Sequence, residues 1–128
     1  METQSESKLE YFRRNGQFSD LMILAWSEME FNINQLVARQ FELFYTDEKF
    51  RKLLKGRFYK FQNRIEFLKE KGVITQEEFS RIEELKKYRN SLFHGEDWAF
   101  FIKDENEKNK IMDEAISVAN LTLDMLVR

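Results

Sequence analysis

The feature that most constrains the fold is a long series of apolar residues spaced at steps of three or four. Its members are Met22, Trp26, Met29, Ile33, Val37, Phe41 and Phe44. This spacing places every member on one side of an α-helix, whereas a strand would alternate at every second residue. The series therefore predicts a long amphipathic helix that is capped by Ser19 or Asp20, runs to about Tyr45 and buries one face.

The rest of the chain is also typical of helices. None of its 128 residues is proline and only four are glycine, which favours uninterrupted helices over strands and turns. Ser7 and Glu10 have the spacing of a capping box in front of a short helix, and Thr75 and Glu78 repeat it in front of a longer one. We expect the second of these helices to continue until Gly95 stops it.

The region between the long helix and Thr75 has its own boundary signals. The segment 46–48 is predicted to end the long helix and to cap the next one. Gly56 is a candidate break between two helices, and Lys71-Gly72 is a typical helix C-terminal signal.

The last predicted helix begins near residues 104–106 and continues to the end of the sequence. It carries two adjacent apolar stripes: Ile111, Ala115, Val118, Thr122 and Met125 in one, and Met112, Ile116, Ala119, Leu123 and Leu126 in the other. A helix that is apolar over so much of its surface either lies at the centre of the fold or packs against a second subunit. The short apolar run 96–102 before it is predicted to be a loop over the core or a strand-like strip.

These elements predict an all-α fold, an antiparallel bundle of four to five helices in one domain over residues 1–128, with residues 1–17 partly frayed. Cysteine is absent and histidine occurs once, which excludes thiolate and multi-histidine metal sites. The sequence has no signal-peptide pattern and no apolar stretch of membrane-spanning length. We therefore expect a cytoplasmic protein with no metal, no cofactor and no membrane partner.

Three polar residues gather at the end of the helix that Thr75 begins. On a helical wheel, Arg89 falls inside the apolar arc, where a guanidinium is costly to bury without a partner. Asn90 and His94, four positions apart, lie at the edge of the same arc. Three interpretations of Arg89, Asn90 and His94 are open. They have a structural role at the helix end, they bind an anion or nucleotide, or they cleave a phosphodiester. Cleavage needs a proton carrier near neutral pKa and a fixed cation, which His94 and Arg89 can supply.

The segment Arg89-Asn90-Ser91-Leu92-Phe93-His94 resembles the defining motif of HEPN domains, in which a polar residue follows the arginine and histidine ends the motif. The expected bundle, with the motif late in its penultimate main helix, resembles the HEPN architecture as well. The resemblance implies a metal-independent endoribonuclease, usually a homodimer that brings two motifs together in a cleft. It implies that His94 and Arg89 assist attack of the RNA 2′-hydroxyl on the adjacent phosphate and that Asn90 orients the site.

Many HEPN ribonucleases are toxins or act in phage defence, which implies a possible antitoxin or partner protein. Toxins that pair with nucleotidyltransferase antitoxins often carry a tyrosine two residues after the histidine, where this chain has Glu96. The acidic pair Glu96-Asp97 also lies close to the expected phosphate position. Some HEPN domains are non-catalytic modules that bind a nucleotide, RNA or a partner protein, and this is the alternative interpretation.

The region from Lys49 to Arg64 is basic and contains no acidic residue. Its candidate RNA-binding residues are Lys52, Lys55, Arg57, Lys60 and Arg64. They form either a solvated helix face or a surface that guides RNA to the motif. Because the formal net charge of the chain is −2, any contact with RNA must be local.

Overall fold

The computed structural model describes residues 6–93 and 104–128, with the side chains of 91–93 excepted. Within these ranges it contains six helices and no strand, which confirms the all-α prediction. The helices are α1 (Lys8–Arg14), α2 (Phe18–Gln40), α3 (Glu48–Lys55), α4 (Phe61–Glu70), α5 (Gln76–Phe93) and α7 (Glu105–Met125).

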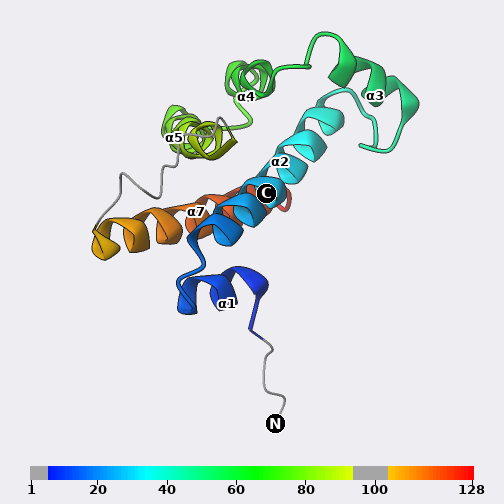
Figure 1. The fold of residues 1–128 in the computed structure, drawn as a ribbon. Coiled ribbons are helices and arrows are strands. Elements are labelled where there is room, and N and C mark those ends of the chain that lie inside the picture. The colour runs from blue at the N-terminus through cyan, green and yellow to red at the C-terminus, as the bar shows by residue number, and fades with distance from the viewer. Residues whose placement is uncertain (1–5, 94–103) are drawn as a thin grey trace.

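The pair α2 and α7 forms the middle of the fold (Figure 1). On one side of this pair lie α4 and α5, which pack against each other and against α2. On another side, α1 packs against both α2 and α7. Helix α3 lies beyond the C-terminal end of α2, away from α1. The central position of α2 explains its long apolar stripe, since the helix has neighbours on several sides.

A buried polar contact links the two central helices. Asn32 of α2 donates from Nδ2 to Thr122 Oγ1 of α7 at 3.1 Å, and the Thr122 hydroxyl donates to the Ala119 carbonyl at 2.8 Å. The Thr122 side chain is fully buried and Asn32 nearly so. Since a buried amide without a partner is costly, this contact favours one alignment of α2 along α7.

The predicted boundaries of α2 were wrong at both ends. The helix begins at Phe18 after Gln17, so Ser19 and Asp20 lie in its first turn and are not the cap. It ends at Gln40, about five residues before the predicted Tyr45. There Glu42 adopts a left-handed backbone with φ of 57°, and the Leu43 amide donates to the Ala38 carbonyl at 3.0 Å. Such an ending usually uses glycine, and no glycine is present here to signal it.

The other boundaries in the described ranges were predicted closely. The Ser7 hydroxyl accepts from the Glu10 amide at 3.1 Å, as a capping residue should. Gly56 follows α3, and Gly72, with φ of 73°, follows α4. Asp104 caps α7. The predicted stop at Gly95 and the apolar run 96–102 lie outside the described residues.

The capping box at the start of α5 also contacts Arg128, which follows α7. The Thr75 amide donates to Glu78 Oε1 at 2.8 Å, and the Glu78 amide donates to Thr75 Oγ1 at 3.1 Å. Arg128 donates from Nη2 to the same Glu78 oxygen at 2.8 Å. The Arg128 guanidinium therefore holds the pKa of Glu78 below its ordinary value, and the bonds from Thr75 act in the same direction, against the opposing effect of burial.

This lowered pKa predicts an acid-sensitive contribution to stability. Because the native state favours ionised Glu78, its contribution is present above the ordinary pKa of 4.5 and is lost as the pH falls through the lower native value. We expect Glu78→Gln to lower the free energy of unfolding by about 1 kcal/mol at pH 7 and by much less near pH 3. Urea unfolding at both pH values measures this difference. Glu77→Gln, an exposed neighbour in the same turn, is the control; an equal loss at both pH values for Glu78→Gln would contradict the assignment.

Candidate functional site

Arg89 lies on the inner side of α5, as the helical wheel predicts. Its side chain is half-buried, and its guanidinium carbon lies 5.0 Å from the centre of the Trp26 ring of α2. Arg89 Nη1 also donates to Asn90 Oδ1 at 3.1 Å. A guanidinium over an indole is a favourable cation–π arrangement. The Trp26 ring and the Asn90 side chain therefore both position the Arg89 guanidinium.

Trp26 also brings the start of α4 to this place. Its ring centre lies 4.7 Å from that of Phe61, the first residue of α4. One residue later, Gln62 bonds to two residues of α5: its Nε2 donates to Glu83 at 2.9 Å, and its Oε1 accepts from Lys86 at 2.9 Å. The first turn of α4 therefore lies beside the middle of α5.

Tyr88 is a titratable group next to Arg89 in this turn. Burial raises the pKa of the Tyr88 phenol, and the nearby Glu84 carboxylate raises it further. The phenol is therefore protonated at neutral pH, where it can donate a hydrogen bond but cannot act as a general base. His94, the predicted proton carrier, lies outside the described residues, so the structure does not place it against Arg89 or Asn90.

Four of the five candidate RNA-binding residues are exposed. Lys52 and Lys55 lie on α3, and Arg57 and Lys60 lie on the segment that joins α3 to α4. The Arg57 guanidinium carbon lies 4.8 Å from the centre of the Phe58 ring, so Arg57 also covers part of the aromatic core. These four residues are available to a polyanion.

Arg64, the fifth candidate, has a different place. It is buried, and its guanidinium binds the segment before α4: Nε donates to the Phe58 carbonyl at 2.7 Å and Nη2 to the Tyr59 carbonyl at 3.1 Å. Nη1 donates to Asn34 Oδ1 of α2 at 3.2 Å and lies 3.7 Å from Glu30. Burial lowers the pKa of Arg64 and the Glu30 carboxylate opposes that effect. Arg64 ties this segment to α2, and we do not include it in an RNA-binding surface.

Sequence reasoning missed two aromatic residues of this region. Trp26 was assigned only to the core stripe, although its ring supports Arg89. Tyr59, between Arg57 and Lys60, has 72% of its surface exposed. Its position inside the basic region could have indicated this role from sequence, because exposed aromatic rings among cations are typical of surfaces that stack nucleotide bases.

No cluster of three or more metal-ligating side chains occurs in the described part of the chain. None of the described helices has both the length and the apolar character needed to cross a bilayer. Comparison with models of protein families, with curated proteins and with solved structures found no match.

The two kinds of basic residue predict different effects on stability. Arg64→Met would leave two carbonyls and an amide oxygen without their donor, so we expect it to lower the free energy of unfolding by about 2–4 kcal/mol. Lys60→Met, at an exposed position four residues earlier, should change it by less than about 0.5 kcal/mol. Chemical denaturation followed by circular dichroism measures both values. Equal stability of the two variants would show that Arg64 does not hold the segment.

Proposed function

We propose that this protein is an RNA-binding HEPN-type domain that cleaves RNA without a metal ion, in the cytoplasm. The observation that supports it best is the Arg89 guanidinium over the Trp26 ring, with Phe61 at the start of α4 against the same ring. A guanidinium held in advance can stabilise charge on a phosphate without an ordering cost at the moment of reaction.

The proposed reaction is attack of an RNA 2′-hydroxyl on the adjacent phosphate. The bond between phosphorus and the 2′-oxygen forms as the bond to the 5′-oxygen breaks, which gives a 2′,3′-cyclic phosphate and a 5′-hydroxyl. The 2′-hydroxyl gives its proton to a neutral imidazole or to water, and the 5′-oxygen takes a proton from an imidazolium or from water. His94 would carry a proton or orient the phosphate, Arg89 would stabilise the developing charge, and Asn90 would orient the arginine.

The proposed RNA path follows the exposed cations of α3 and the segment after it. Lys52, Lys55, Arg57 and Lys60 lead along the chain to the start of α4, which adjoins Arg89 through Trp26. Tyr59 offers an exposed ring on which a base can stack. This arrangement favours single-stranded RNA, whose bases are free to stack. A toxin or phage-defence role, with an antitoxin or other protein partner, belongs to the same proposal.

A non-catalytic HEPN module is the second candidate, and two observations favour it. Arg89 is already engaged by Trp26 and Asn90 of its own chain. The acidic pair Glu96-Asp97 begins two residues after His94 in sequence and would repel a phosphate. In this candidate the same surface binds RNA or a nucleotide and leaves it intact.

Cleavage of RNA in EDTA by the wild type and by His94→Ala tests the first candidate. We expect the wild type to cut single-stranded RNA in EDTA and to leave cyclic phosphate ends, because neither His94 nor Arg89 needs a metal for its proposed role. His94→Ala and Arg89→Ala should each reduce the rate by about 100-fold or more. Arg14→Ala, an exposed arginine on the distant α1, should leave it unchanged.

The same experiment separates the two candidates. A wild type that binds RNA and does not cut it would support the non-catalytic module. Cutting that is equal in the wild type and in His94→Ala would exclude the proposed chemistry. Circular dichroism of each variant shows whether a lost activity reflects a lost fold.

A further inference from the structure

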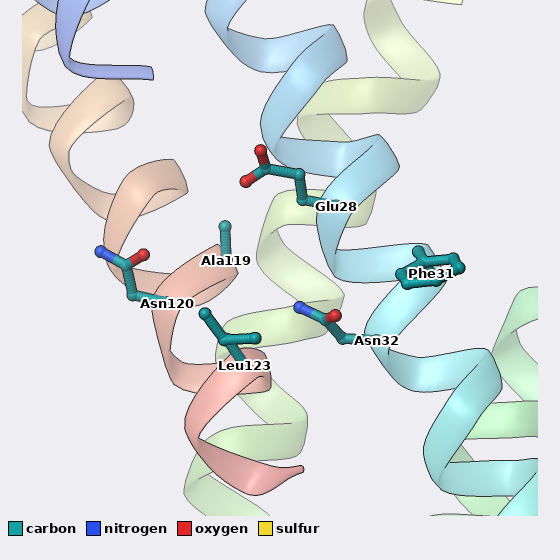
Figure 2. Close-up of a pocket in the computed structure, with 6 residues that line it drawn as sticks. All are labelled: Glu28, Phe31, Asn32, Ala119, Asn120 and Leu123. Atoms are coloured by element: carbon teal, nitrogen blue, oxygen red, sulfur yellow. The ribbon is translucent and has the colours of Figure 1, made fainter. Parts of the chain in front are cut away.

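The hollow between α2 and α7 offers few groups that could recognise a ligand (Figure 2). Among the described residues its lining includes the carboxylate of Glu28 and no cation. Its buried amide, Asn32, already donates to Thr122 of α7. A hollow along α4 is better equipped, because side chains of both charges line it and few of their polar groups are engaged.

This α4 hollow has a volume of about 180 Å³. Such a volume suits one planar ring system and is too small for a drug-sized ligand. Two buried phenylalanine rings, whose centres are 5.0 Å apart, form the apolar part of the lining, and four exposed polar side chains form the rest. The lining residues are Arg57, Phe58, Asn63, Glu66, Phe67 and Glu70.

Arg57 is held at the α4 hollow by contacts with both rings. Its guanidinium carbon lies 4.8 Å from the centre of the Phe58 ring and 5.2 Å from the centre of the Phe67 ring. The Arg57 carbonyl also accepts from Asn63 Nδ2 at 3.3 Å. The guanidinium N–H groups make no hydrogen bond to any residue within the described ranges. They are therefore available to the acceptors of a ligand while the rings position the cation.

Two carboxylates share the α4 hollow with Arg57. Glu66 and Glu70 are four positions apart, so they lie one above the other on one face of α4. Glu66 accepts from Gln62 Nε2 at 3.2 Å, whereas Glu70 accepts no hydrogen bond from the described part of the chain. No ion pair joins either carboxylate to Arg57 there. A ligand that carries both acceptors and N–H donors could therefore bind the cation and a carboxylate together.

Among the RNA bases, guanine carries the groups that match these partners. Its O6 and N7 are neighbouring acceptors, which an arginine guanidinium commonly binds as a pair. Its N1–H and 2-amino group are neighbouring donors, which one carboxylate can accept as a pair. Adenine and cytosine each offer one amino group as a donor, and uracil offers one ring N–H. Guanine is therefore the base that can use both pairs of contacts.

We propose that the α4 hollow binds a guanine base of single-stranded RNA. The Arg57 guanidinium donates to O6 and N7, and the Glu70 carboxylate accepts from N1–H and the 2-amino group. Tyr59, exposed and two positions after Arg57, stacks a neighbouring base. This assignment rests on the proposed function, because Arg57 belongs to the proposed RNA path, and it adds the identity of one base that the path recognises.

Binding of short RNAs that differ in one base tests the assignment. The probes are 2′-O-methyl uridine oligonucleotides with guanosine, adenosine, cytidine, uridine or inosine at the centre, because RNA without a free 2′-hydroxyl stays intact. By fluorescence anisotropy we expect the guanosine probe to bind about tenfold or more tightly than the others. Inosine, which lacks the 2-amino group, should lose most of this preference. GMP should bind more weakly than the guanosine probe, since it cannot also reach Tyr59 and the cations of α3.

The variant Glu70→Gln separates base recognition from simple charge. Loss of a negative charge alone would raise the affinity for every RNA. If Glu70 accepts from guanine, the variant instead binds the guanosine probe about tenfold more weakly and binds the uridine probe at least as well as before. Glu48→Gln, at an exposed carboxylate of α3 outside the hollow, is the control and should keep the guanine preference.

The variant Arg57→Lys tests the other pair of contacts. Lysine keeps the positive charge and lacks the planar fork, so we expect general RNA affinity to be retained and the guanine preference to be lost. A wild type that binds all five probes equally would overturn the guanine site, whereas one that binds none would contradict the proposed function itself. A guanine preference that survives both Glu70→Gln and Arg57→Lys would overturn the assignment to this hollow, and GMP binding as tight as the guanosine probe would overturn RNA as the source of the base.

Discussion

Trp26 is the side chain on which both the fold and the candidate site depend, because its ring contacts two other helices at once. Phe61 at the start of α4 and Arg89 near the end of α5 both lie against it. These contacts come from residues far apart in sequence, and they set the antiparallel order of α4 and α5 on α2. Loss of the indole would therefore remove a core contact and the support of the arginine together.

The helix boundaries could be predicted from sequence where capping residues mark them. Thr75 and Glu78, and Asp104 before α7, mark starts that the structure confirms. The end of α2 could not be predicted, because Glu42 takes the left-handed conformation that usually requires glycine. Burial of Arg89 followed from the helical period, but its partner Trp26 did not, since periodicity says which face is buried and not what covers it.

The basic segment shows the same limit at the level of single residues. Charge alone could not separate Arg64 from Lys60, and only the packing of the segment on α2 shows that Arg64 binds backbone carbonyls.

If RNA binds the Arg89 guanidinium, the fluorescence of Trp26, which lies against that guanidinium, can report the binding. The chain has two tryptophans, so Trp98→Phe leaves Trp26 as the sole indole emitter. The measurement is a titration of this variant with a short single-stranded RNA, with tryptophan emission and RNA anisotropy recorded together. We expect Trp26 emission to change in step with binding, because a phosphate that binds the Arg89 guanidinium alters the contact of the guanidinium with the Trp26 ring. Binding that saturates with an unchanged emission spectrum would contradict it.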